Sequence, residues 1–203
     1  EPRAYYERKD RQEAELQASK KTEDNAIDAI GSYFQLLGDR MNHSTPIEQA
    51  RRMEDGKSAD NRRKGINSLV ERPFGQRPPY TTRYGEIAIG VPAANSGPDP
   101  DYVVRATAIR ALNRARDAAS TPVFIKALSD RSDIVRLEAA KALNNVPDPA
   151  ATAPLLQRLA DVNETMDVRI AAAEALRHYK TLEVARALVA TLAELLAALP
   201  AAS

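Results

Sequence analysis

The sequence contains no cysteine, no tryptophan and only two histidines, His43 and His178. Without cysteine, neither a disulfide framework nor a thiolate metal site can form. Two histidines far apart in the chain give little support to a histidine-based metal site, so we expect no metal and no cofactor. A transmembrane helix needs a run of about 18 or more apolar residues, and none occurs. These absences exclude a disulfide-stapled, thiolate-metal or helical membrane-spanning protein.

A clear excess of one charge is also missing, because the net charge is only +1. The whole molecule therefore does not attract an anionic partner by its field. No pair of carboxylates stands out from the surface charge, and we predict that the protein is not an enzyme. The chain begins with Glu1 rather than methionine, so we expect that a preceding segment was removed. An exported protein without its signal peptide and a trimmed cytosolic protein both fit, and we favour the exported one.

One short phrase occurs three times between Asp99 and Glu194: Val-Arg, followed by two alanines and a leucine at fixed distances. Arg136 follows Arg105 by 31 residues, and Arg169 follows Arg136 by 33. A fixed period with apolar positions in register indicates stacked structural repeats. We therefore predict an all-α, right-handed solenoid of helix pairs. Its predicted regular repeats are residues 99–129, 130–160 and 161–194, with a tail at 195–203.

A weaker copy of the phrase precedes the regular repeats. Arg62 takes the place of Arg105 and Leu69 that of Leu112, with small residues between them. We interpret residues 59–98 as a degenerate first repeat whose second helix is roughly Tyr80–Ala88. Prolines and glycines concentrate in two stretches, which we predict to be loops. Long loops on a repeat scaffold often form the binding face, and here they are Glu71–Pro79 and Gly90–Pro100.

The N-terminal part differs from the repeats. Residues 1–21 contain six basic and five acidic residues and few large apolar ones, which predicts a disordered charged arm. Residues 22–58 are predicted to form a helical pair. The first helix, residues 23–37, is indicated by apolar residues in 3-4-3 spacing. The second begins with Thr45 as N-cap, Pro46 as the first helical residue and Glu48 completing a capping box.

The arginine of the phrase recurs in every regular repeat, at Arg105, Arg136 and Arg169. In a stack these side chains would form a ladder that meets acidic groups or helix-end carbonyls. The ladder either joins the repeats or forms an anion-binding stripe, and its regularity favours the structural role. Each regular repeat also opens with an aspartate that we expect to cap the following helix, namely Asp99, Asp130 and Asp161.

A local charge asymmetry lies in residues 51–84, which contain nine basic and four acidic residues. Aromatic residues are interleaved with the basic ones, and arginine and tyrosine carry much binding energy at protein interfaces. A solvated helix face with loops explains the same composition. Nucleic acid is a less favoured partner, because the sequence pI is only about 8.2. The predicted partner-binding residues are Arg62, Arg63, Lys64, Arg72, Arg77, Tyr80, Arg83 and Tyr84.

The last predicted helix carries more leucine and valine than one side of a helix normally buries. Uncovered apolar patches usually mark an interface. We therefore expect this end to be covered by another chain or by further repeats, or else by the tail folding back. The residues of this oligomer or capping interface are Leu192, Leu195, Leu196 and Leu199.

The Val-Arg, alanine and leucine phrase resembles the HEAT repeat in the short form common in bacterial proteins, including phycobilin lyases. The whole chain also resembles bacterial HEAT-repeat lipoproteins of unknown function, but the cysteine that would carry the lipid is absent. HEAT-type metal hydroxylases need repeated His-Glu pairs, and none occurs here. HEAT-like DNA glycosylases use aromatic and acidic groups in a basic groove, whereas this chain has only 5% aromatic residues.

The resemblance and the residues together predict a non-enzymatic scaffold or adaptor. Stacked helix pairs give an extended surface on which a protein partner can lie. The alternatives are nucleic-acid or polyanion binding through residues 51–84, and a HEAT-like lyase or ligand chaperone.

Overall fold

The computed structural model describes residues 45–91 and 96–197. These residues contain α-helices and short 3-10 helices but no strand, apart from an isolated antiparallel bridge between Val91 and Ser96. The 3-10 helices are η1 (Pro73–Gln76), η3 (Ala118–Ser120) and η4 (Pro149–Ala151). The α-helices are α2 (Pro46–Met53), α3 (Ala59–Val70), α4 (Tyr80–Ile89), α5 (Tyr102–Ala115), α6 (Thr121–Ala127), α7 (Asp133–Asn145), α8 (Thr152–Ala160), α9 (Met166–Leu176) and α10 (Leu182–Ala197).

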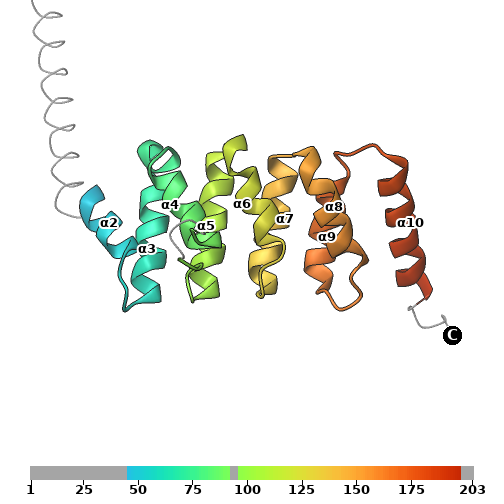
Figure 1. The fold of residues 1–203 in the computed structure, drawn as a ribbon, viewed down its shortest axis with the longest axis horizontal. Helices are drawn as coiled ribbons and strands as arrows, with labels where there is room; N and C mark the ends of the chain where they lie inside the picture. The colour runs from blue at the N-terminus through green and yellow to red at the C-terminus, as the bar shows by residue number, and fades with distance from the viewer. Residues whose placement is uncertain (1–44, 92–95, 198–203) are drawn as a thin grey trace, which may run out of the picture. The chain divides into compact units, whose positions relative to one another are not determined.

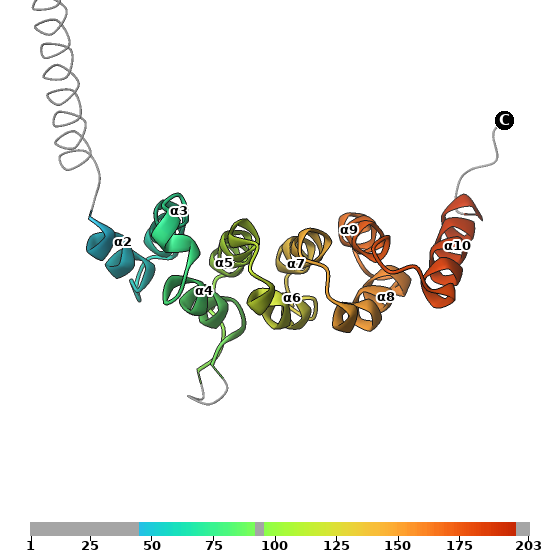
Figure 2. The same ribbon diagram turned by 90° about the horizontal axis from the view of Figure 1, so that it is seen from above.

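The helices form two layers that advance along the chain (Figures 1 and 2). The helices α3, α5, α7 and α9, each carrying one copy of the Val-Arg phrase or its degenerate form, pack on one another in sequence order. The helices α4, α6 and α8 form the second layer, and each packs against the following helix of the first layer. This arrangement is an all-α solenoid, as the period of the phrase predicted.

The alanines and leucines of the phrase build the core between the layers. Leu112, Leu143 and Leu176 are fully buried at equivalent places in three successive repeats. The alanines that precede them are buried as well, and their small side chains let neighbouring helices approach closely. The second layer contributes Phe124 and Leu155 to the same continuous cluster. The apolar register read from the sequence is therefore the register of the core.

The chain divides into two units, Glu1–Thr45 and Pro46–Ser203. The arm predicted at 1–21 and the helix predicted at 23–37 lie outside the described residues. Helix α2 belongs to the second unit and packs on α3 at Gly65. A Cβ added to Gly65 would lie 2.5 Å from the backbone nitrogen of Met53 and 2.6 Å from the carbonyl oxygen of Gln49. Gly65 therefore sets the close approach of the two helices.

The three aspartates expected to cap helices do not do so. The N-cap residues of α5, α7 and α9 are Asp101, Ser132 and Thr165. The Asp99 and Asp130 side chains instead accept hydrogen bonds from the backbone N–H two residues later and from arginines of the preceding repeat. This prediction was wrong because charged donors from the neighbouring repeat occupy these carboxylates.

Candidate partner-binding surface

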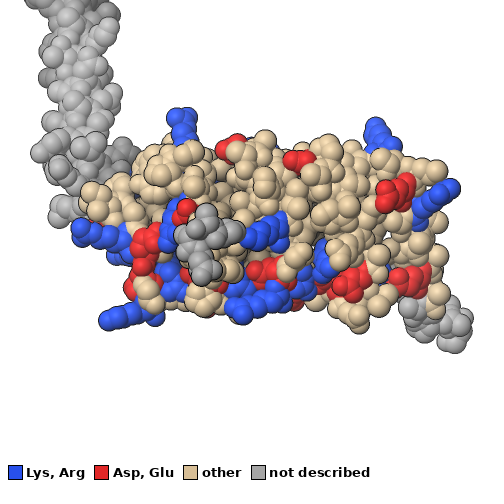
Figure 3. Space-filling model, viewed as in Figure 1, with Lys and Arg blue, Asp and Glu red and all other residues tan. Residues whose placement is uncertain are grey.

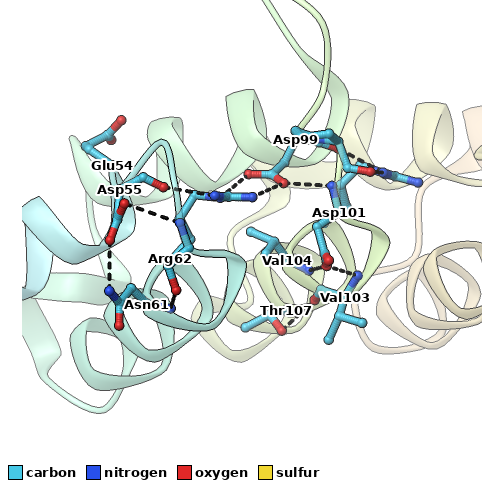
Figure 4. A network of polar contacts seen from close by, with 12 residues as sticks. Glu54, Asp55, Asn61, Arg62, Asp99, Asp101, Val103, Val104 and Thr107 are labelled. Atoms are coloured by element: carbon cyan, nitrogen blue, oxygen red, sulfur yellow. Dashed lines mark hydrogen bonds and ion pairs between the residues drawn. The ribbon is translucent and has the colours of Figure 1, made fainter.

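The first rung of the arginine ladder joins α3 to the turn before α5. Arg62 donates from Nε and Nη2 to the two carboxylate oxygens of Asp99, at 2.7 and 2.9 Å, and from Nη1 to the carbonyl oxygen of Asp55 at 2.9 Å. Figure 4 shows the Arg62 side chain extended toward Asp99, with Asn61 held by Asp55 on the other side. The hydrogen bonds that Arg62 donates to Asp99 outweigh burial and raise the pKa of Arg62. The degenerate repeat thus takes part in the ladder as a regular one does.

The next two rungs repeat this geometry. Arg105 is bidentate to Asp130 at 2.8 Å for both contacts, and Arg136 is bidentate to Glu164 at 2.7 and 2.6 Å. Arg105 also donates to the carbonyl oxygen of Asp99, and Arg136 to that of Asp130. Asp99 and Asp130 therefore each hold two arginines, one through the carboxylate and one through the backbone. The rungs form one connected polar network along the stack.

The last rung is different. Arg169 donates from Nε to the carbonyl oxygen of Leu159 at 3.0 Å, and its contacts with Glu194 on α10 are 3.3 and 3.1 Å long. The side chain of Glu194 is 47% exposed, whereas that of Glu164 is 1% exposed. Water therefore competes for Glu194, and this rung is the weakest electrostatic link of the ladder.

Four of the nine basic residues of the 51–84 stretch, including Arg62 of the ladder, have carboxylate partners. On the exposed side of α3, Arg63 and Lys64 both pair with Asp60. Arg83 pairs with Glu54 and Glu86, and these hydrogen bonds outweigh burial and raise its pKa. Figure 3 shows basic and acidic side chains interleaved across the lower half of this face, without a continuous patch of one sign. The local excess of positive charge is therefore compensated only in part, because five of the nine basic residues have no carboxylate partner among the described residues.

Three of the eight predicted residues come together at one corner, around η1 and the start of α4. Arg72 is the N-cap of η1 and Arg77 its C-cap, and Tyr80 begins α4. The ring of Phe74, 40% exposed, lies 5.8 Å from that of Tyr80 between centroids. Among the described residues, neither Arg72 nor Arg77 has a carboxylate partner. We call Arg72, Phe74, Arg77 and Tyr80 the η1 corner.

The backbone of the η1 corner is fixed against α3. Gln76 donates from its side chain to the carbonyl oxygen of Val70 at 2.9 Å, and the N–H of Arg72 donates to that of Leu69 at 3.0 Å. A Cβ at Gly75 would collide with the carbonyl group of Leu69, so only glycine allows this approach. The corner is a turn fixed against α3, in which Phe74 and Arg77 are exposed and Arg72 and Tyr80 are half-buried.

Two of the predicted contact residues have other roles. Tyr84 is fully buried, so the prediction that it contacts a partner was wrong for this residue. Its spacing places it on the inner face of α4, where burial raises the pKa of its hydroxyl group. Arg62 is engaged in the ladder with Asp99 and is only 12% exposed. A single sequence cannot distinguish an arginine or tyrosine that packs inward from one that faces a partner.

Two open clefts flank the loop after α4. The larger, about 730 Å³, lies between the end of α4, the residues before α5 and the end of α6. Lys126 and Arg131 line it, and they donate to the carbonyl oxygens of Ile89 and Pro100. The smaller cleft, about 350 Å³, lies between α4 and α6 on the other side. Both are open surface features, and the contribution of this loop to a binding face stays a prediction.

The part of the chain that the structure describes contains no group of three or more histidine, aspartate or glutamate residues that could hold a metal ion. His178 shares a hydrogen bond of 2.9 Å between its Nε2 and the side chain of Asn144, and His43 lies outside the described residues. None of the helices at 45–91 and 96–197 is long and apolar enough to cross a membrane.

The residues of the predicted C-terminal interface lie on or beyond α10. Leu192 and Leu196 are 57% and 59% exposed. The side chain of Leu195 and the whole of Leu199 lie outside the described part.

The acidic partners of the ladder and the aromatic member Phe74 of the η1 corner were not among the predicted site residues. The only sequence signal for Phe74 is its place among basic residues.

Residues 94–177 match a family model described as HEAT repeats. No curated protein matches the sequence.

Proposed function

Because the chain carries HEAT repeats, which in general serve as protein-interaction scaffolds, we propose that it is a non-enzymatic scaffold for a protein partner. The observation that carries the proposal is the η1 corner, where two arginines and two aromatic side chains, exposed or half-buried, gather without acidic partners among the described residues. Such side chains are enriched in the energetically dominant part of protein interfaces.

The corner has the physical properties of an interface anchor. Arg72 and Arg77 keep their hydrogen-bond donors available because the described carboxylates around them are used by other cations. Phe74 and Tyr80 bring apolar area at a small entropic cost, since each ring contacts the other and the turn beneath them is rigid. A partner with a carboxylate beside an apolar pocket would match this arrangement.

The pairing of Arg63, Lys64 and Arg83 with carboxylates argues against a nucleic-acid backbone as the ligand. Those pairs would have to break for phosphates to bind, and the two cations of the corner cannot follow an extended strand. The corner therefore supports a protein partner better than a polyanion.

The test begins with affinity capture from the native source and identification of the bound protein by mass spectrometry. Its affinity is then measured with the double variant Arg72→Glu, Arg77→Glu. We expect a loss of at least about tenfold, because two charge-assisted contacts become repulsive. The matched control is Lys141→Glu, Arg177→Glu, which makes the same charge change at exposed positions of later repeats. It should keep wild-type affinity.

Equal affinities for the two double variants would contradict the role of the η1 corner. The polyanion alternative is measured separately, by fluorescence anisotropy with single-stranded and double-stranded oligonucleotides at two salt concentrations. Tight binding that weakens steeply with salt would replace the scaffold proposal with nucleic-acid binding.

A further inference from the structure

The outer side of α10 carries a regular apolar stripe. Leu182, Val189 and Leu196 are spaced seven residues apart, and they are 66%, 66% and 59% exposed. Ala185 and Leu192 lie between them, so the spacing alternates between three and four residues. This is the spacing of the a and d positions of a coiled-coil seam.

The opposite side of α10 already has partners. Val184 is buried, and Ala187 and Leu188 pack against the core cluster through contacts with α8. Glu194 receives Arg169 on that side too. On a helix these positions lie roughly opposite the a and d positions. The stripe therefore faces away from the helices that α10 contacts.

The spacing of the residues in the stripe is the same in both chain directions. From Ala185 to Leu196 the steps are four, three and four residues. If a second α10 lies antiparallel across a two-fold axis, Val189 faces Leu192 of the other copy and Ala185 faces Leu196. Each apolar residue of one copy then meets an apolar residue of the other, as an isologous interface requires.

The small number of charged residues on α10 is consistent with an apolar partner at the stripe. Glu183 and Arg186 are the only charged residues of α10 besides Glu194, and both lie in its first two turns. Near the centre of the antiparallel pair, around residues 189–192, no charge of either copy opposes another. We propose that the stripe is a self-association site, where α10 pairs with α10 of a second copy in antiparallel orientation. This proposal does not depend on the scaffold function.

The first experiment measures the dimer dissociation constant of the full chain by analytical ultracentrifugation over a dilution series. Val189→Glu should raise it by at least about tenfold, because the new charge is buried without a partner at the seam. The matched control is Val162→Glu. Val162 is 68% exposed in the turn between α8 and α9 and does not belong to the stripe, so the dissociation constant of this variant should equal that of the wild type. Circular dichroism checks that both variants keep their helix content.

The second experiment tests the orientation by disulfide cross-linking, which is clean because the chain has no cysteine of its own. A mixture of Ala185→Cys and Leu196→Cys chains should cross-link to each other under mild oxidation. Neither variant should cross-link alone, because two equal positions in the antiparallel pair are 11 residues apart in register, about 16 Å, beyond the reach of a disulfide.

A monomer at every concentration would overturn self-association at this site. Cross-linking of each variant with itself, and not in the mixture, would show a parallel pair and overturn the antiparallel arrangement. A dimer that survives Val189→Glu unchanged would place self-association elsewhere and overturn the site.

Discussion

The helices α8 and α10 occupy equivalent places in successive repeats and yet differ in burial. Leu159 of α8 is 2% exposed. Leu192, which lies 33 residues later at the same place of the following repeat, is 57% exposed. Leu156 is half-buried, and its counterpart Val189 is 66% exposed. The residue types are alike, so the difference comes from the neighbours. A repeat pattern specifies which side chains are apolar, and the position in the stack decides which of them are covered.

The first layer shows the same contrast. The residue after the phrase arginine is buried at Ala106, half-buried at Leu137 and 51% exposed at Ile170. The exposure of the carboxylates in the ladder also increases along the stack, because Arg136 binds a buried carboxylate and Arg169 a half-exposed one. Within the described residues, α7 contacts helices of the repeats on both of its sides, whereas α10 contacts α8 on one side only.

The largest effect is expected from truncating the two equivalent leucines. Leu159→Ala should lower the free energy of unfolding by about 2–5 kcal/mol, because it leaves a cavity between α8 and α9. Leu192→Ala should change it by less than about 0.5 kcal/mol in the monomer, since this side chain is already in water. Urea denaturation at low protein concentration measures both. Equal losses would mean that α10 is covered as fully as α8.

A smaller effect is expected in the ladder. Arg136→Met should cost about 1–3 kcal/mol, because it leaves the buried carboxylate of Glu164 without its bidentate partner. Arg169→Met should cost less than about 1 kcal/mol, because water can solvate the half-exposed Glu194. The same denaturation experiment compares them, with the wild type as reference. A larger loss for Arg169→Met would reverse the proposed order of the rungs.

The smallest expected effect is a loss of folding stability at low pH through protonation of Glu164. Burial acts to raise the pKa of Glu164, but hydrogen bonds from Arg136 and from the N–H of Thr165 outweigh it and hold the pKa below its ordinary 4.5. The unfolded chain therefore binds this proton at a higher pH than the folded chain. The stabilisation is present above about pH 4.5 and is lost as the pH falls through the lowered folded-state pKa.

Thermal unfolding between pH 6 and pH 3, in roughly half-unit steps, measures this loss. Below pH 4.5, the ordinary pKa of the glutamate side chain, the wild type should lose stability more steeply than Glu164→Gln. The glutamine of this variant cannot titrate there. Glu194→Gln, the same substitution at the exposed end of the ladder, is measured beside it as the control for removing a carboxylate. Identical slopes for wild type and Glu164→Gln would contradict the assignment.

Much of the fold could be predicted from the phrase because its apolar positions are local and periodic. Leu112, Leu143 and Leu176 were placed correctly in the core, and the expected helix at Tyr80–Ala88 agrees with α4. The degenerate repeat was predicted from Arg62, Leu69 and the small residues Gly65 and Ser68 between them, and Arg62 binds Asp99 as the arginines of the next two repeats bind their carboxylates. These inferences hold because helix pairs in a solenoid contact mainly their sequence neighbours.

The partner-binding residues were harder to predict because pairing is non-local. Arg62 finds Asp99 37 residues away and Arg83 finds Glu54 29 residues away, distances that no local pattern encodes. The caps were misplaced for the same reason, since Asp99 and Asp130 serve the repeat before them. Whether an arginine is available to a partner depends on contacts that only the three-dimensional structure shows.

The third regular repeat begins with a turn two residues longer than its predecessor, and the ladder accommodates it. Arg136 does not reach back to Asp161, which stands where Asp130 stands one repeat earlier, but binds Glu164, three residues further on. The guanidinium of Arg136 thus binds the carboxylate that lies close enough to it. The glutamate side chain, one methylene longer than that of aspartate, spans the remaining distance. Insertions in these turns should be tolerated wherever an acidic residue follows them. For an engineer who wishes to lengthen the array, the rule is to match each arginine to a carboxylate in space rather than to copy the turn residue by residue.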